Sequence, residues 1–279
     1  MIALSHYQAK IILNFFERKF SEAEVSLDLG ISNARIKFSD GKVFFPDGQS
    51  ISIEDVKEIT KNENVCFVVE ENIVKKIHFF SEKTNQFYKL LPTGFSTAPT
   101  VEISGIRMHA VKDIEPMADA KEKIDSIKPF SGNILDTCSG LGYTAILSSE
   151  YGEVFTHEAD ENIIRMEKYN PWSRKLFTIK NIHRVHASIL DKIGSFKDGF
   201  FDAIIHDPPS FKIAGELYTR DFYKELFRVL KKEGRMYHYI GSPGKRNRNV
   251  NIEKGILKRL EECGFSFLER AAKGIVVGK

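Results

Sequence analysis

Cysteine is scarce in this sequence, and the few that occur are scattered. Cys66, Cys138 and Cys263 stand far apart among 279 residues, with none of the paired spacings through which cysteines bind zinc. Small secreted domains held by disulfides use more cysteines, usually in even numbers. The pattern therefore argues against a cysteine-based metal site and favours a reducing compartment.

Long apolar runs are also missing. The N-terminal segment MIALSHYQAKIILNFFERKF interrupts its apolar stretches with charged and polar side chains. A transmembrane helix needs about 20 predominantly apolar residues, and a signal peptide needs a continuous apolar segment of roughly 7–15. We therefore expect a soluble, cytoplasmic protein that uses neither a membrane partner nor a metal ion.

A strong excess of one charge is a third absence. The net charge is +3, with 12 basic and 13 acidic residues in 1–95 and 29 basic and 25 acidic residues in 96–279. Domains that bind nucleic acid mainly through phosphates usually carry a more basic face. The balance permits a nucleic-acid partner without requiring one, while 42% apolar and 28% charged residues are typical of a globular protein.

The N-terminal part of the chain has the patterns of a small α+β domain. Apolar side chains recur at helical spacing in residues 6–19, and residues 53–61 predict a second, shorter helix. Alternating patterns predict a strand at 24–30 and two strands within 65–80, around Glu70-Glu71-Asn72. Asp40-Gly41 is expected to centre a hairpin turn in ARIKFSDGKVFFPDG. The competing interpretation of SEAEVSLDLGIS is a DNA-binding helix-turn-helix, but the period-2 alternation favours strands.

A domain boundary is expected where the composition changes. Residues 91–105, LPTGFSTAPTVEISG, are rich in proline, threonine, serine and glycine. We place the boundary between residues 95 and 96, so that 1–95 form an accessory domain and 96–279 a second, larger domain.

The larger domain alternates strands and helices, which predicts a doubly wound α/β sheet with right-handed crossovers. Its last two strand patterns lie too close together for a helical crossover, so the sheet is expected to end in an antiparallel hairpin. The predicted strands are 133–139, 153–160, 183–189, 200–207, 234–242, 265–272 and 274–279. The predicted helices are 116–128, which begins at Pro116, and 142–150, 161–169, 216–231 and 252–262.

A glycine loop follows the first of these strands. In NILDTCSGLGYTA, Gly140 and Gly142 allow the backbone to approach a ligand closely, and Asp136 stands at the mouth of the loop. Glu158 ends the next strand, where it can accept hydrogen bonds from a ribose diol. GLGYTA also satisfies a dinucleotide fingerprint, but an acid is unfavourable beside a pyrophosphate and suits the cationic amino acid group of S-adenosylmethionine.

The stretch IIHDPPSF ends another strand with an acid and two prolines. Each proline fixes its own φ and restricts the preceding residue, so Asp207 and Pro208 are held rigidly. Phe211 offers a flat face on which a base can stack. The alternative is that Pro-Pro only terminates a strand, which leaves the acid and the aromatic residue unexplained.

Basic residues near these loops are weaker candidates for contact with a substrate. Arg107 and His109 follow the linker, while Lys245, Arg246 and Arg248 in GSPGKRNRN follow the fifth strand. The latter three are our candidates for binding RNA phosphates, although such residues are often only solvated.

The segments NILDTCSGLGYTAI, EVFTHEADENII and FFDAIIHDPPSF resemble, in order and spacing, motifs I, II and IV of the class I S-adenosylmethionine-dependent methyltransferases. The resemblance covers residues 115–279 and implies a seven-stranded Rossmann-like sheet whose last strand is antiparallel. APTVEISGIRMH, YNPWSRKL and HDPPSFKIAGELY further resemble archaeal predicted methyltransferases along the whole chain. The implied cofactor residues are Asp136, Cys138, Gly140, Gly142, Tyr143, Glu158, Ser188 and Ile189, and the implied catalytic residues are Asp207, Pro208 and Phe211.

The resemblance implies methylation of a nucleobase nitrogen, because Asp/Asn-Pro-Pro-aromatic marks such enzymes. Carbon methylation needs a cysteine in or after this motif, and no cysteine lies between Asp207 and Glu262. We expect methylation of tRNA or rRNA at guanine N7 or N2 or at adenine N6, with the N-terminal domain helping to hold the RNA. The alternatives are a small-molecule methyl- or aminopropyl-transferase and a non-catalytic adaptor that keeps the fold.

Overall fold

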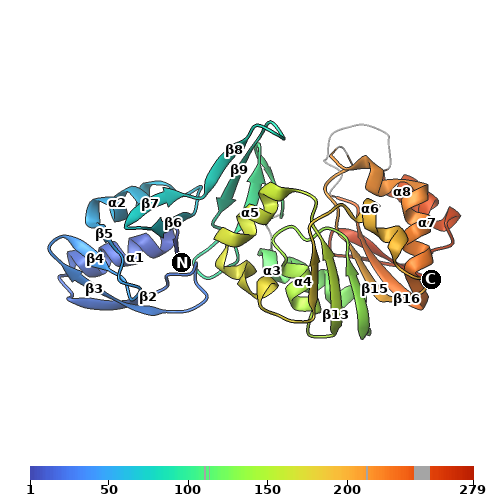
Figure 1. Cartoon of the computed structure of the whole chain (residues 1–279), viewed down its shortest axis with the longest axis horizontal. Helices are drawn as coiled ribbons and strands as arrows, with labels where there is room; N and C mark the ends of the chain where they lie inside the picture. Colours follow the sequence, from blue (N-terminus) through green and yellow to red (C-terminus); the bar gives the residue numbers. More distant parts are fainter. Residues whose placement is uncertain (110, 113, 212, 242–251) are drawn as a thin grey trace. The chain divides into compact units, whose positions relative to one another are not determined.

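A computed structural model of the chain describes residues 1–109, 111–112, 114–211, 213–241 and 252–279, which form two compact units (Figure 1). The first unit comprises Met1–Met117 and Asn162–Arg174, and the second comprises Ala118–Glu161 and Lys175–Lys279. The boundary predicted at residues 95 and 96 lies within the first unit. No helix in the described ranges is both long and apolar enough to span a bilayer.

The described residues of the first unit form three small antiparallel sheets, with the strand orders β1-β6-β7, β2-β3-β4-β5 and β11-β10-β9-β8. Helices α1 and α2 and nearly all of α5 (Glu161–Tyr169) belong to the same unit. The other elements are β1 (Ile2–Leu4), α1 (His6–Glu17), β2 (Glu22–Val25), β3 (Ala34–Ser39), β4 (Lys42–Phe44), β5 (Ser50–Ser52), α2 (Ile53–Lys61), β6 (Phe67–Glu70), β7 (Ile73–Lys76), β8 (His78–Ser81), β9 (Gln86–Leu91), β10 (Thr100–Ile103) and β11 (Ile106–Arg107).

Local sequence signals explain several of these elements. Asp40 and Gly41, with φ of 48° and 71°, form the tight turn between β3 and β4. Ser52 caps α2, since its hydroxyl accepts the N–H of Asp55 while the Asp55 carboxylate accepts the N–H of Ser52. The second of the two strands predicted within residues 65–80 is instead divided at Ile77, because β7 and β8 belong to different sheets.

The second unit contains a seven-stranded sheet of order β14-β13-β12-β15-β16-β18-β17. The pairs that join β14 through β16 are parallel, whereas β18 runs antiparallel to both β16 and β17. This is the predicted Rossmann-like methyltransferase sheet with its antiparallel last strand. Its elements are α3 (Pro116–Ser126), β12 (Gly132–Asp136), α4 (Tyr143–Ser148), β13 (Gly152–His157), β14 (Ile182–Val185), α6 (Ile189–Lys192), β15 (Phe201–His206), α7 (Arg220–Val229), β16 (Leu230–Tyr239), α8 (Ile252–Glu262), β17 (Ser266–Ala271) and β18 (Gly274–Gly278).

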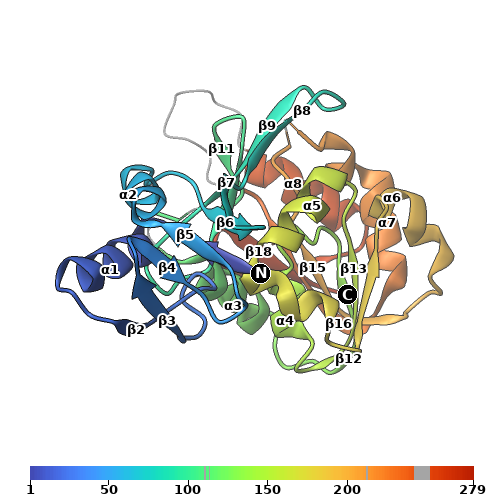
Figure 2. The same cartoon turned by 60° about the vertical axis from the view of Figure 1, so that its left-hand side comes forward.

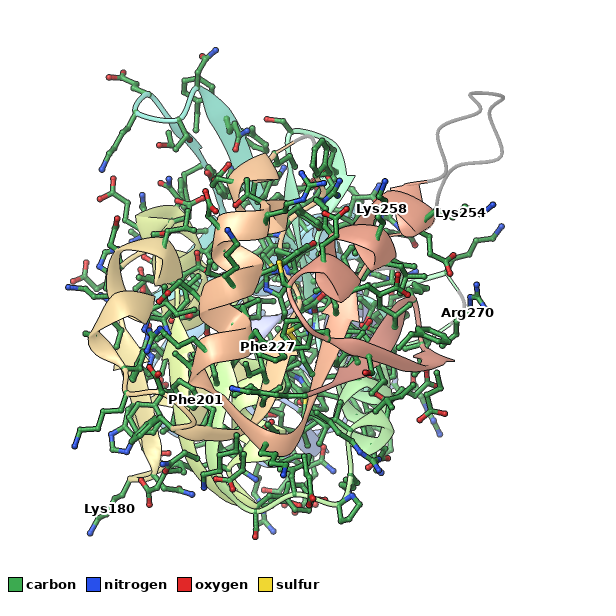
Figure 3. All side chains as sticks on the ribbon, turned by 90° about the vertical axis from the view of Figure 1, so that its right-hand side faces the viewer. Lys180, Phe201, Phe227, Lys254, Lys258 and Arg270 are labelled. Carbon is green, nitrogen blue, oxygen red and sulfur yellow. The ribbon has the colours of Figure 1, made fainter. Side chains whose placement is uncertain are left out.

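Helices cover both faces of this sheet (Figures 1 and 2). On one face, α3 and α4 cover the sheet. Helix α3 packs its apolar side chains against β15 and β16, and the residues in contact are Ile124, Ile127, Ala203, Ile205 and Tyr237. Helix α4 packs against β12 and β13. The other face carries α6, α7 and α8, whose apolar side chains form one core with the sheet. Figure 3 looks onto this second face and labels Phe201 of β15 and Phe227 of α7, which belong to that core.

Candidate functional site

Three acidic residues lie at the carboxyl ends of neighbouring strands. Strand β12 pairs in parallel with β13 on one side and with β15 on the other. Asp136 is the last residue of β12, Glu158 follows β13 directly, and Asp207 follows β15 directly. Because parallel strands end at the same edge of a sheet, the fold brings these predicted residues together where doubly wound sheets bind ligands.

The loop after β12 is held by backbone hydrogen bonds. The N–H of Thr137 donates to the carbonyl of Ile205 at 3.0 Å, and the N–H of Ser139 donates to the carbonyl of His157 at 2.7 Å. The loop therefore joins the ends of all three strands. The partly buried Cys138 lies in it, and burial raises the pKa of its thiol well above the ordinary value.

Two glycines shape the end of this loop. Gly140 and Gly142 have φ of 55° and 78°, in the left-handed region that favours glycine. A Cβ on Gly142 would lie 2.6 Å from a methyl carbon of Leu176, so close packing also requires glycine there. Gly142 is the N-cap of α4, and the first helical residue, Tyr143, is buried.

Asp136 is fully buried, and its two carboxylate oxygens differ in their hydrogen bonds. Oδ2 accepts hydrogen bonds from the hydroxyls of Thr156 at 2.8 Å and Thr144 at 3.2 Å. Oδ1 has no hydrogen-bond partner in the part of the chain that the structure describes. Burial raises the pKa of Asp136 to about 7. A buried acceptor without a partner suits a cationic donor, which would offset the cost of desolvation.

Glu158 is fixed by main-chain donors. Its Oε2 accepts the N–H of Gly140 at 2.9 Å, and its Oε1 accepts the N–H of Asp160 at 2.9 Å. Burial raises the pKa of Glu158 to about 7, against the lowering effect of these hydrogen bonds. The carboxyl group is thus oriented beside the glycine loop, and its role towards a ribose stays a prediction.

Ser188 and Ile189 lie at the start of α6, after β14. The Ser188 hydroxyl accepts the N–H of Leu190 at 3.3 Å and so caps the helix. The Ile189 side chain is buried in the core between the sheet and the helices. The predicted adenine contact through the backbone of these residues is compatible with their position, because their side chains are used for capping and packing.

Asp207 is paired with a lysine that the sequence did not point to. The Nζ atom of Lys123, on α3, donates to Oδ2 of Asp207 at 2.6 Å and lies 2.6 Å from Oδ2 of Asp119. The side chains of Lys123 and Asp119 are buried, whereas that of Asp207 is 24% exposed. Burial alone would lower the pKa of Lys123, but the charges of Asp207 and Asp119 outweigh it and raise that pKa.

The residues after Asp207 form a partly exposed aromatic surface. Pro208 is buried, and the carbonyl of Pro209 accepts a hydrogen bond from the Tyr218 hydroxyl at 2.9 Å. Phe211 contacts the Tyr218 ring edge-on, with a distance of 5.5 Å between centroids, and its side chain is 53% exposed. One carboxylate and one accessible aromatic face therefore follow β15 within five residues.

His206 takes no part in this surface, although it adjoins Asp207. Its Nε2 lies 3.1 Å from the carbonyl of Leu217, so we assign the proton there, and its Nδ1 accepts from the Thr137 hydroxyl at 2.8 Å. Burial lowers the pKa of His206 well below the ordinary value, and His238 adds to this effect. The ring packs towards α7, whereas Asp207 meets α3, so the two residues occupy opposite faces, as alternation along a strand requires.

The weaker candidates belong to the first unit or fall outside the described residues. Arg107 is on β11 of the first unit, where its guanidinium is 3.8 Å from Glu102, and His109 in the same unit contacts the Thr100 hydroxyl at 2.9 Å. Lys245, Arg246 and Arg248 fall outside the described residues. Within the described ranges, no cluster of three or more His, Cys, Asp or Glu side chains is placed to hold a metal ion.

Sequence reasoning missed Lys123 and Asp119. The residues lie four apart in MADAKEKIDSIK, so they share a helical face, but this spacing is common among solvated ion pairs. The one available signal was that both lie on the side of the helix that also carries Ile124 and Ile127. Only the packing of α3 against β15 and β16 reveals that this pair reaches Asp207.

Comparison with known proteins gives one close relative and several structures of similar fold. No protein-family model matches the chain. Among solved structures, spermidine synthase bound to the transition-state analogue AdoDATO has a TM-score of 0.55 at 18% identity, covering 74% of each chain. Spermidine synthase from Thermotoga maritima has a TM-score of 0.53 at 19% identity, covering 74% of this chain and 73% of the other. MnmC2 from Aquifex aeolicus has a TM-score of 0.51 at 16% identity, covering 69% of each.

These likenesses concern the fold alone, since identity is low. The sequence relationship is closer: "Uncharacterized protein MJ1233" of Methanocaldococcus jannaschii is 38% identical over 287 residues, which cover 100% of this chain and 97% of that protein. The chain therefore belongs to the MJ1233 family and has a Rossmann-like methyltransferase fold.

Proposed function

We propose that this protein is an S-adenosylmethionine-dependent methyltransferase that methylates a base nitrogen of tRNA or rRNA, at guanine N7 or N2 or at adenine N6. The observation that carries the proposal is the arrangement at the sheet edge. A rigidly held carboxylate and an exposed aromatic ring follow β15, directly beside the strand that ends in the glycine loop and Asp136.

The residues of the loop fit the cofactor. The unpartnered Oδ1 of Asp136 is suited to the amino group of the methionine part, and Gly140 and Gly142 let the backbone approach. We expect Glu158 to accept hydrogen bonds from the ribose hydroxyls, and the backbone at Ser188 and Ile189 to contact the adenine. Cys138 and Tyr143 complete the loop. When bound, the cofactor supplies an electrophilic methyl group on a sulfonium.

The residues after β15 suit a neutral base. Asp207 can accept a hydrogen bond from the N–H of a base and so orient the acceptor nitrogen, while Phe211 can stack on the ring. Lys123 keeps the carboxylate fixed at 2.6 Å. In-line methyl transfer depends largely on such positioning, so no strong general base is required.

The proposal is tested by transfer of a tritiated methyl group from the labelled cofactor to RNA from cells that lack the gene. We expect wild-type protein to label RNA, and Asp207→Asn to reduce the rate by roughly 100-fold because the base is no longer oriented. Asp221→Asn is the matched control, since the Asp221 side chain is 94% exposed on α7. Labelling of no RNA by wild-type protein would refute the proposed substrate.

The structural likeness to spermidine synthases suggests an alternative substrate, a small amine, and the same assay distinguishes it from RNA. An aminopropyl- or methyl-transferase acting on a small amine would modify polyamines and leave RNA unlabelled. A non-catalytic adaptor would show no calorimetric affinity for S-adenosylmethionine. Both outcomes differ from the one expected here.

A further inference from the structure

Behind the partly exposed Asp207 lie two buried charges, those of Lys123 and Asp119, which do not themselves contact the acceptor in the proposed reaction. The Lys123 side chain is 6% exposed, and its ammonium lies 2.6 Å from a carboxylate oxygen on each side. Burying an unpaired ammonium is costly, but two carboxylates at this distance compensate for the lost water. The pKa of Lys123 is raised, since the charges of the two aspartates outweigh the effect of burial, so the lysine is charged at neutral pH.

Two tyrosines of β16 are associated with this group: Tyr239 lies near the ammonium, and Tyr237 is influenced by the charges of the two aspartates. The Tyr239 ring centroid is 6.0 Å from Nζ of Lys123, near the limit for a cation–π interaction. The Tyr237 hydroxyl is buried and has no hydrogen-bond partner among the residues described. Burial raises the pKa of Tyr237, and the charges of Asp207 and Asp119 raise it further, so its hydroxyl stays neutral. Carboxylates beside aromatic rings are a common environment for an alkylammonium.

We infer that Asp119 and Asp207 form an ammonium-binding site which Lys123 fills from within the chain, and that Lys123 thereby selects an uncharged acceptor over a cationic amine. The part concerning selection rests on the proposed function, in which Asp207 faces the acceptor. The ammonium-binding site itself is a property of the folded protein and does not depend on any reaction.

The selection follows from the charges. Asp207 is the member of the group that remains partly exposed, so an incoming substrate meets this carboxylate first. A cationic amine beside it would also meet the Lys123 charge, which is already 2.6 Å from the same oxygen. A neutral base meets no such repulsion and can donate a hydrogen bond to the remaining lone pairs of Asp207.

The experiment removes the Lys123 side chain and supplies a similar alkylammonium ion in solution. In Lys123→Ala, the two carboxylates and the vacated space are expected to bind butylammonium, which resembles the lost side chain. Butylammonium chloride should raise the melting temperature by ~2–4 °C or more relative to sodium chloride at equal ionic strength. Wild-type protein and Lys121→Ala should show no such difference, because Lys121 pairs with Asp125 on the exposed side of the same helix.

A second variant separates this site from general effects of the amine. Asp119→Asn/Lys123→Ala lacks one carboxylate and should lose most of the stabilisation by butylammonium. If Lys123→Ala does not fold in plain buffer, it is refolded in butylammonium chloride and in sodium chloride. Folded protein that is recovered with butylammonium but not with sodium supports the inference. Equal melting temperatures in both salts, or no recovery with either, would overturn it.

Selection is tested by calorimetry with 1,3-diaminopropane. We expect binding to Lys123→Ala and none to wild-type protein; binding to wild-type protein that is lost in Asp207→Asn would overturn the selective role. These measurements do not involve methyl transfer. A failure to label RNA therefore refutes the proposed function alone, whereas absence of amine binding by the variant refutes the ammonium site alone.

Discussion

At the scale of single residues, the buried carboxyl group of Asp136 links cofactor binding to pH. Burial raises its pKa to about 7, well above the value of about 4 expected in the unfolded chain. The folded protein therefore holds this proton more tightly, and the contribution of Asp136 to stability declines as the pH rises from about 4 to about 7. A bound ammonium, in contrast, requires the ionised form.

We accordingly predict that affinity for S-adenosylhomocysteine, which carries the same amino acid group, rises with pH through about 7. Below this pH, binding must displace the proton, which weakens affinity by up to about tenfold per pH unit. Isothermal titration calorimetry between pH 5.5 and 8.5 measures the effect. Asp136→Asn should bind S-adenosylhomocysteine more weakly and lose the pH dependence that Asp136 causes. If the affinity of this variant depends on pH as in wild-type protein, the dependence arises from another group, such as Glu158.

Single residues also show why the site was only partly predictable. Asp136, Glu158 and Asp207 can be placed at one edge of the sheet from the sequence, because each ends a recognisable strand pattern and strand ends meet in a parallel sheet. Lys123 was not found, because its partner Asp207 is 84 residues away and nothing local distinguishes it from a solvated lysine. The role of Glu158 as an acceptor for the Gly140 N–H likewise depends on loop geometry.

At the scale of elements, the ends of β12 and β15 are coupled through Thr137. Its hydroxyl lies 2.8 Å from Nδ1 of His206, a buried atom whose ring is held on the other side by Leu217. This contact joins the glycine loop to the strand that delivers Asp207. Loss of the hydroxyl would leave a buried acceptor without its donor.

Thr137→Val, which keeps the shape of the side chain, should therefore lower the free energy of unfolding by about 1–3 kcal/mol. Thr137→Ser retains the hydroxyl and should lose less than half of this amount. Urea denaturation of the three proteins provides the measurement. If the valine variant is as stable as wild-type protein, the contact with His206 contributes nothing to coupling the two strands.

Elements with strong local signals were predicted well. Helix α2 has the predicted bounds, because its capping box and helical spacing agree, and the β3–β4 turn forms at Asp40-Gly41. The short strands β1 and β5, of three residues each, lack a detectable pattern. Helix α7 begins at Arg220 instead of 216, because Gly215–Tyr218 form a separate 3-10 helix and Thr219 is the N-cap of α7.

At the scale of the whole molecule, compact units do not follow the order of the chain. Residues 162–174 group with the first unit, where the indole N–H of Trp172 donates to the carbonyl of Leu29 at 3.1 Å and Arg165 lies over the Phe79 ring. Strand and helix patterns cannot reveal such a grouping, because it depends on contacts between residues more than 80 positions apart. The alternation that predicts the doubly wound sheet does not depend on them, so the fold class was predictable.

The net charge of the whole molecule, +3, permits a nucleic-acid substrate but does not require one. The substrate must therefore be identified by a direct chemical measurement. Mass spectrometry of nucleosides from total tRNA and rRNA, in strains with and without the gene, tests the central claim. We predict that one methylated guanosine or adenosine, carrying its methyl group on a base nitrogen, is lost without the gene, returns with the wild-type gene and does not return with Asp207→Asn. Identical nucleoside profiles in the two strains would contradict the proposal that this protein methylates RNA.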